Sequence, residues 1–432
     1  MTDVVRTGRN AARVHAGRGL HGPSTAECTV DGLEIVGRLP EGLRGRFLRI
    51  GPEPRSGARI APGHATDGAA MVHEVRVAAG RADYRNRWIS DDGADAPNSG
   101  LVVHEGRLYA LGAHRRPVRL DASLVPTGDD VLGATRGSGA HAHVDPVWDE
   151  LLVVEAAPTE SLLSITTIDM KGKVRRVVEV PTDAPVLVHD FAFTDQYIVV
   201  IASGAQEDGD RVLWDPTRPA RIGLIPRDGD APVARWFEAS PRVVWHFMNA
   251  YEADGEVVID HVAHRQPIVG TPGAVELPGS TAPVLCRTVV TPVTGDVRDE
   301  VLDERAVEYP AIDPRRAGLR HRVAYAALAS SRFAGHLGEF DGIVRYDFRS
   351  DEVSDLVFDG HVTVGAPVVA RRAGGTGEDD AWVLTIASDA DAGTSRLVVL
   401  DPRTFDRGPV AEIVLPQMVP LGHHALWIAD GE

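Results

Sequence analysis

The chain has 432 residues, of which 43% are hydrophobic and 25% are charged, a balance that suits a folded protein and excludes disorder throughout. Its formal net charge is −17, and no run of lysine or arginine offsets it. Nucleic acids and anionic membranes are therefore poor electrostatic partners. The length exceeds that of an ordinary domain, which leaves two domains or one large closed architecture.

The cysteine count and the hydropathy bear on the compartment of the protein and on its contact with membranes. Cys28 and Cys286 are too few for a disulfide framework, so we expect a reducing compartment and assign the chain to the cytoplasm. The first 24 residues carry no apolar run of signal-peptide length, and no stretch approaches the roughly 20 apolar residues of a membrane span. Peripheral membrane contact stays open, although no apolar helix supports it.

Short strands follow one another along the chain. Runs rich in β-branched residues predict strands at 151–155, 174–180, 197–201, 257–262 and 382–386. Glycine and proline are spread between these runs, and the pair Asp254-Gly255 is typical of a turn between two strands. No amphipathic helix of 12 or more residues is evident.

This pattern favours one closed all-β body. Blades of roughly 40–60 residues would give a propeller of about seven blades at this length. Two β-sandwiches in tandem are the alternative, but no Pro/Gly/Ser-rich linker divides the chain in the middle. We expect a flexible N-terminal arm over 1–27 and a single β-propeller domain over 28–432.

Four of the 17 histidines have distinctive surroundings: His141, His189, His246 and His424. They are separated by 48, 57 and 178 residues, intervals that match one, one and three blades. Equivalent points on the blades of a propeller converge at its axis, so these side chains could meet there. Most other histidines, His264 among them, are expected to be ordinary surface or satisfied core residues.

Four neutral imidazoles suit a divalent ion such as Fe(II), Zn or Cu. An octahedral ion would keep two positions open for dioxygen and for substrate or water, whereas a closed tetrahedral zinc site would be structural. A rival grouping is the pair His141 and His143, but no glutamate follows at the spacing of a cupin site. Of His423 and His424, neighbours on a strand, at most one can join the cluster.

Several segments resemble the carotenoid cleavage oxygenases, the family of the lignostilbene-cleaving enzymes and the retinal isomerohydrolase. The resemblance begins with the Gly-Arg-Leu-Pro-Glu-Gly segment at Gly37 and covers nearly all of the chain after it. It includes the His-Asp-Phe segment at His189, the His-Phe-x-Asn-Ala-Tyr-Glu segment at His246 and the Pro-x-Gly-x-His segment that ends at His424. The segment Glu308-Tyr-Pro-Ala-Ile-Asp-Pro matches one whose glutamate supports a metal ligand.

The resemblance implies a seven-bladed β-propeller with loops forming a cap over an axial metal site. It further implies a mononuclear non-haem Fe(II) held by His141, His189, His246 and His424, with Glu308 supporting one of these ligands without touching the metal. The implied reaction is cleavage of a C=C bond of an apolar substrate, an apocarotenoid, isoprenoid or other alkene, with O2 to two carbonyl products. No catalytic residue beyond the metal centre is implied, in agreement with the lack of a nucleophile motif in the sequence.

Three positions depart from the family pattern. Two further glutamates that usually accept hydrogen bonds from ligand histidines align with Ala113 and Ala366, and His114 is a candidate substitute at the first gap. Gly112 stands where phenol-binding stilbene cleavers tend to carry a lysine. We therefore keep two alternatives to the dioxygenase: a metalloenzyme of the same fold that oxidises or isomerises without cleavage, and a non-catalytic propeller.

Overall fold

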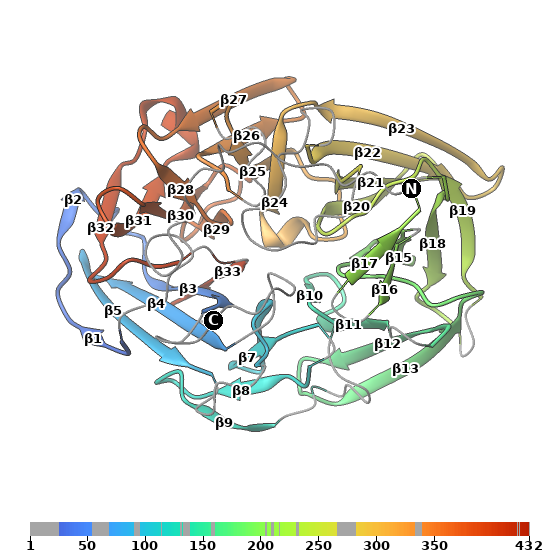
Figure 1. The fold of residues 1–432 in the computed structure, drawn as a ribbon, viewed down its shortest axis with the longest axis horizontal. Helices are drawn as coiled ribbons and strands as arrows, with labels where there is room; N and C mark the ends of the chain where they lie inside the picture. Colours follow the sequence, from blue (N-terminus) through green and yellow to red (C-terminus); the bar gives the residue numbers. More distant parts are fainter. Residues whose placement is uncertain are drawn as a thin grey trace, which may run out of the picture.

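Sheets of four or more strands surround a common axis in the computed structural model of the chain (Figure 1). Seven such sheets, the blades of a β-propeller, are formed by the residues that the structure describes. The described residues are 26–53, 69–89, 96–113, 115–129, 132, 139–156, 160–203, 205–208, 211–215, 217–229, 233–265, 282–332, 339–420, 422 and 424–431. The predicted propeller is confirmed, and the predicted arm over 1–27 lies almost wholly outside these residues.

Two sheets contain strands from both ends of the chain. One has the order β1 (Thr29–Val30), β5 (Arg81–Trp88), β4 (Ala70–Ala78), β3 (Gly45–Pro52) and β33 (His424–Ala429). The other has the order β2 (Ile35–Gly37), β32 (Ala411–Val414), β31 (Thr394–Leu400), β30 (Ala381–Asp389) and β28 (Val362–Val364), and β29 (Val368–Arg371) also pairs with β30.

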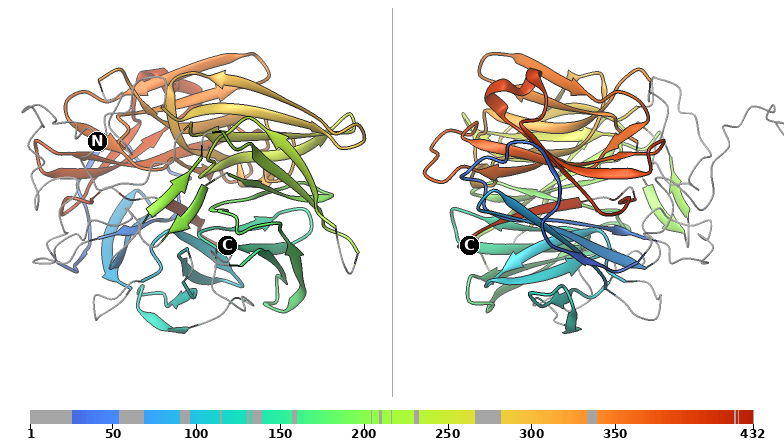
Figure 2. Two further views of the ribbon diagram at one scale, coloured as in Figure 1. Left: turned by 45° about the vertical axis from the view of Figure 1, so that its right-hand side comes forward. Right: turned by 90° about the vertical axis from the view of Figure 1, so that its left-hand side faces the viewer.

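The other five sheets are four-stranded antiparallel meanders. They are β6 (Gly100–His104), β7 (Arg107–Leu111), β8 (Val118–Leu120) and β9 (Pro126–Asp129); β10 (Ala142–Asp145), β11 (Glu150–Ala156), β12 (Leu162–Asp169) and β13 (Val174–Pro181); β14 (Ala192–Phe193), β15 (Tyr197–Ala202), β18 (Ala220–Pro226) and β19 (Arg235–Ala239); β20 (Phe247–Ala253), β21 (Glu256–Ala263), β22 (Val284–Thr291) and β23 (Asp296–Asp303); and β24 (Ala306–Ile312), β25 (Val323–Ala329), β26 (Gly342–Asp347) and β27 (Glu352–Val357). A hairpin of β16 (Ala205–Asp208) and β17 (Arg211–Trp214) stands off one face of the ring (Figure 2), and two 3-10 helices, η2 (Pro314–Arg316) and η3 (Pro402–Arg407), lie in connections.

The strands form where the sequence predicts them, because each predicted run combines β-branched residues with nearby turn residues. All five predicted strands are present, as β11, β13, β15, β21 and β30. Asp254 and Gly255 join β20 to β21 with φ values of +53° and +82°, the left-handed backbone that a two-residue hairpin requires. The described residues include no helix that is long and apolar enough to cross a membrane.

The blades are held together by apolar side chains that fill the space between neighbouring sheets. Val199 and Ile222 of one blade and Ala250 and Ile259 of the next belong to one core cluster, and all four are fully buried. Each blade therefore stabilises its neighbours, since burial of an aliphatic side chain contributes about 1.5–3 kcal/mol.

The ring closes where the last strand joins the first blade. The register of β33 on β3 pairs His424 with Ile50 and Ala429 with Gly45. Because β33 occupies the innermost position of this sheet, closure of the ring also brings His424 to the axis. The fold thus fixes one candidate ligand through contact between the two ends of the chain.

Gly45 offers a test of this closure. A Cβ atom there would lie 2.3 Å from the carbonyl oxygen of Ile428 and 2.6 Å from the indole of Trp427, and the φ of Gly45 is +154°. Gly45→Ala should destabilise the protein by roughly 2–4 kcal/mol, because the strands must separate. The measurement is the shift in the midpoint of urea unfolding.

Gly80→Ala is the matched control, since Gly80 also has a positive φ, +74°, but a Cβ atom added there would meet no other atom within 4 Å. We expect a loss of only about 1 kcal/mol from backbone strain. Equal losses in the two variants would contradict the account of closure.

Candidate metal centre

The four histidines selected from the sequence lie at the start of the innermost strands of four different blades. His141 and His246 directly precede β10 and β20, His189 lies three residues before β14, and His424 is the first residue of β33. Figure 1 shows β10, β20 and β33 near the centre of the ring. The intervals in the sequence are whole blades, as predicted, because the same point recurs on each meander.

Their side chains converge on a single point. One nitrogen from each of the four rings lies within 4.8 Å of the others. The Nε2 atoms of His141 and His189 are 3.4 Å apart, and those of His246 and His424 are 3.0 Å apart. Neighbouring rings meet edge to face, with centroids 4.4 Å apart for His141 and His424. The structure therefore brings together all four residues that the sequence analysis selected.

Glu308 fixes the orientation of one of these rings. Its carboxylate accepts a hydrogen bond of 2.6 Å from Nδ1 of His246 and another of 2.6 Å from Nε2 of His264. A neutral imidazole that donates through Nδ1 has a bare Nε2, so the lone pair of His246 is directed at the cluster. The backbone N–H of Tyr309 donates to the same carboxylate over 2.5 Å and holds it in place.

Burial and neighbouring groups shift the pKa values of Glu308, His246 and His141. Burial would raise the pKa of Glu308, but His246 and His264 outweigh burial and hold it well below its usual range. Burial lowers the tendency of His246 to protonate, yet the neighbouring Glu308 carboxylate raises the pKa of His246 overall. For His141, burial dominates and lowers the pKa to about 4, so this ring is neutral at pH 7.

Asp190 joins two of the blades that carry the histidines. Its carboxylate accepts hydrogen bonds from the backbone N–H groups of Phe191, over 2.8 Å, and Phe247, over 3.1 Å. Asp190 follows His189 in the chain, and Phe247 follows His246. The carboxylate of Asp190 therefore ties together the two backbone segments that carry these histidines. Burial would raise the pKa of Asp190, but attraction to the His141 and His143 rings lowers it strongly.

His143 belongs to this support and not to the cluster. Its Nε2 donates to Asp190 over 2.7 Å, and its ring lies parallel to that of His141 with a centroid separation of 6.3 Å. The group of converging nitrogens contains His141 without His143, so the two do not form a ligand pair of the cupin kind.

The geometry of the cluster fits a metal ion. Bonds of roughly 2.1 Å from imidazole nitrogen to a first-row metal place adjacent ligand atoms about 3.0–3.4 Å apart. Two Nε2 pairs of the cluster lie at 3.0 Å and 3.4 Å. Bare nitrogens at such distances repel one another unless a cation lies between them, and imidazole is a suitable ligand for iron, zinc and copper.

Two of the three positions that depart from the family pattern are alanines, Ala113 and Ala366. Ala366 is buried and lines a cavity together with His424, while Ala113 follows shortly after the end of the second strand of its blade. Neither can offer a carboxylate. His114, the candidate substitute, and His423 lie outside the described residues.

Two supporting residues were missed by sequence reasoning. His264 is a core residue, as expected, but it also bonds the carboxylate oxygen of Glu308 that His246 does not use. Asp190 stands inside the His-Asp-Phe segment, and its place beside a candidate ligand is the only signal that the sequence offers. Its partner Phe247 is 57 residues away on another blade, and no local pattern indicates that bond.

Comparison with known proteins agrees with this fold. The sequence profile of the retinal pigment epithelial membrane protein family matches residues 22–429. A carotenoid cleavage oxygenase of Mycobacterium tuberculosis is 27% identical over an alignment of 489 positions, which covers 95% of this chain and 96% of that protein.

Two solved structures share the propeller. The lignostilbene dioxygenase of Pseudomonas brassicacearum superposes with a TM-score of 0.88 at 22% identity, over 99% of this chain and 100% of that one. A cobalt-substituted apocarotenoid oxygenase of Synechocystis gives a TM-score of 0.85 at 22% identity, over 95% and 97% of the two chains. At this identity the two likenesses establish the fold alone.

Substitution of Glu308 tests whether its carboxylate raises the metal affinity of the four-histidine cluster. In Glu308→Gln, the amide has one acceptor for the two imidazole N–H groups, so one ring must change tautomer or lose its bond. We expect affinity for a divalent metal ion to fall roughly 10–100-fold, measured by competition with a chelator at pH 8. The pH below which this affinity begins to fall should also move lower, because the group that raises the pKa of His246 is gone.

Glu252→Gln is the control for this change. Glu252 lies on β20, the strand that follows His246, and its carboxylate accepts hydrogen bonds from Thr194 and from the backbone of Gln196. This variant should keep the metal affinity of the unaltered protein. A Glu308→Gln protein with unchanged affinity and unchanged pH dependence would contradict the assigned support.

Proposed function

Because the chain belongs to the retinal pigment epithelial membrane protein family, the family of the carotenoid cleavage oxygenases, we propose that it is a non-haem Fe(II) dioxygenase. Its reaction is cleavage of a C=C bond in an apolar substrate, an apocarotenoid, an isoprenoid or another alkene, with O2 to give two carbonyl products. The single observation that carries this proposal is the convergence of four imidazole nitrogens within 4.8 Å of one another.

We assign the metal ligands to His141, His189, His246 and His424. Iron(II) bound there would supply the activation of dioxygen, and four protein ligands leave two positions of an octahedral ion for small molecules. The chain itself provides orientation. Glu308 keeps the Nε2 of His246 bare, and Asp190 sets the spacing of two ligand-bearing blades through the Phe247 backbone.

The surroundings of the cluster favour an apolar substrate. The indole of Trp245 lies edge to face with His189 at 5.1 Å, and the ring of Tyr309 lies 5.6 Å from that of His424. Both are large apolar surfaces next to the proposed ion, which suits contact with an alkene.

A phenolic stilbene is a poorer candidate substrate. At Gly112, where phenol-binding relatives tend to carry a lysine, a Cβ atom would lie 2.8 Å from the Cα of Pro97 and 3.3 Å from the backbone nitrogen of Asn98. The backbone thus leaves no room for a side chain at this position. A lysine at position 112 therefore cannot be the group that binds a phenol in this protein.

We also propose that the enzyme acts in the cytoplasm. Both cysteines are free thiols, Cys28 partly exposed and Cys286 buried, which suits a reducing compartment.

The test combines metal content with product analysis. Protein loaded anaerobically with Fe(II) should retain one iron per chain, consume O2 with an apocarotenal or another apolar alkene, and yield two carbonyl fragments by mass spectrometry. His189→Ala and His246→Ala should lose iron and activity together. His361→Ala is the control, because His361 is exposed and its ring contacts Asp391, away from the cluster.

Two results would contradict the proposed reaction or its metal site. Failure to retain iron would contradict the assigned ligands. Retained iron with a product of unchanged mass, or with one oxygen added and no fragments, would replace cleavage by isomerisation or oxidation.

A further inference from the structure

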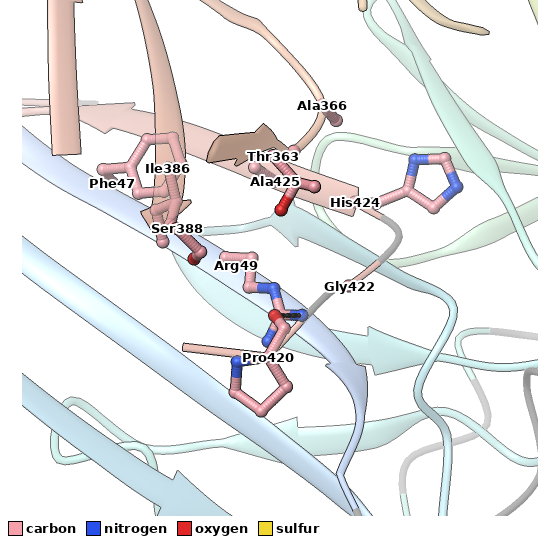
Figure 3. Close-up of a pocket in the computed structure, with 11 residues that line it drawn as sticks. Phe47, Arg49, Thr363, Ala366, Ile386, Ser388, Pro420, Gly422, His424 and Ala425 are labelled. Atoms are coloured by element: carbon pink, nitrogen blue, oxygen red, sulfur yellow. Dashed lines mark hydrogen bonds between the residues drawn. The ribbon is translucent and has the colours of Figure 1, made fainter. Parts of the chain in front are cut away.

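The chain enters β33 through the entry segment, residues 417–420 and Gly422, which precede His424. The course of this segment decides where the His424 ring stands relative to the other three imidazoles. Figure 3 shows Arg49 of β3 next to Pro420 and Gly422. These three residues and His424 line one small cavity of about 20 Å³.

Arg49 holds the entry segment through a hydrogen bond and a close contact. It is buried, with 5% of the residue exposed, and its Nη2 donates to the carbonyl oxygen of Pro420. A Cβ atom on Gly422 would overlap Nη2, Cζ and Nε of Arg49, and one on Gly51 would lie 2.8 Å from the Cα of Gly422. The two glycines therefore leave the space between β3 and the entry segment to the guanidinium.

Buried polar groups of the first blade support Arg49. Attraction to the Glu53 carboxylate opposes the effect of burial, so the pKa of Arg49 falls only to about 10 and the guanidinium stays charged at neutral pH. Glu53 accepts a hydrogen bond of 2.9 Å from Nε2 of His73. Burial lowers the pKa of His73, and Nδ1 of the neutral ring accepts one of 2.7 Å from the hydroxyl of Tyr84.

The same group of side chains reaches the entry segment a second time. Nε2 of Gln417 donates to the hydroxyl of Tyr84 over 3.2 Å. Gln417 and Pro420, three residues apart, are thus both bound to the first blade. Between them, the carbonyl oxygen of Val419 accepts a hydrogen bond of 2.9 Å from Ser388 of the blade that contains β30. The entry segment is therefore held from both sides.

Control of this backbone matters because the carboxylate route is closed at position 366. Ala366 lines the same cavity as His424 and offers no acceptor that could orient the ring. A metal ligand must lie within about 0.2 Å of its bond distance. A small shift of the entry segment would therefore remove the His424 nitrogen from the common point on which the four rings converge.

We propose that Arg49 is a positioning residue, which places His424 for metal binding by holding the entry segment. Glu53, His73 and Tyr84 keep Arg49 charged and in place. The inference rests on the proposed metal site and adds to it a side chain that acts on the ion only through the backbone before His424.

Copper(II) tests this role, because its electron paramagnetic resonance spectrum depends on the number of coordinating nitrogens. With one equivalent of copper(II), the unaltered protein should show four nitrogen ligands and His424→Ala three. Arg49→Met should give the spectrum of His424→Ala, and its copper affinity should fall roughly 10–100-fold in competition with a chelator. Gly422→Ala should have the same effects, because the added methyl group displaces the guanidinium.

Arg46→Met and Gly42→Ala are the matched controls. Arg46 also lies on β3, but its Nε donates to Glu74 over 2.7 Å, and a Cβ atom on Gly42 would meet no other atom within 4 Å. Both variants should keep the four-nitrogen spectrum and the affinity. Gly422→Ala leaves every strand of the first blade unchanged, so it decides the question if Arg49→Met does not fold.

Two results would overturn the proposal, and they differ in what they leave standing. Four nitrogen ligands and unchanged affinity in both Arg49→Met and Gly422→Ala would refute the role of Arg49, even if the variants unfold at lower urea concentration, and would leave the metal site intact. An unaltered protein that binds no copper at the four histidines would contradict the metal site itself, and the positioning of His424 with it.

Discussion

The convergence of four imidazole nitrogens is the arrangement on which the proposed function of this propeller depends. Two pairs of these nitrogens lie 3.0 Å and 3.4 Å apart, and lone pairs directed inward at such distances would repel one another. The ring supplies the restraint, because each histidine stands at the entry of an innermost strand and each blade is packed against its neighbours. A cation at the centre would convert this repulsion into four favourable bonds.

The supports of the cluster are unequal. His246 is oriented by Glu308, which is itself held by His264 and by the backbone of Tyr309. Near His424 the position that could carry a comparable carboxylate is Ala366, and the nearest strong charge in the adjoining cavity is the cation of Arg49. Partners that orient a ligand change metal affinity about 10–100-fold, so this asymmetry is expected to affect how tightly the cluster would hold an ion.

Much of this arrangement could be predicted from the sequence, and the reason is periodicity. Strand runs such as 197–201 and 257–262 follow from β-branched residues, and the whole-blade intervals between His141, His189 and His246 follow from repetition of one meander. Resemblance to a known family added Glu308. Each of these signals is local or regularly repeated, and therefore survives in a single sequence.

The remaining features depend on contacts that no periodicity records. The bond from Phe247 to Asp190 joins two blades, and the role of His264 depends on the rotamer of a glutamate 44 residues away. The cavity at Arg49 arises because β3 and the segment before β33, at opposite ends of the chain, meet at Gly422. Such contacts are set by side-chain packing across the ring, which only the folded structure reveals.

The most direct test of the central claim is anomalous diffraction at the iron edge from crystals grown and loaded with Fe(II) without oxygen. The account predicts one peak on the propeller axis at roughly 2.1 Å from a nitrogen of each of His141, His189, His246 and His424. A peak elsewhere, or one bonded to fewer than four of these rings, would contradict it.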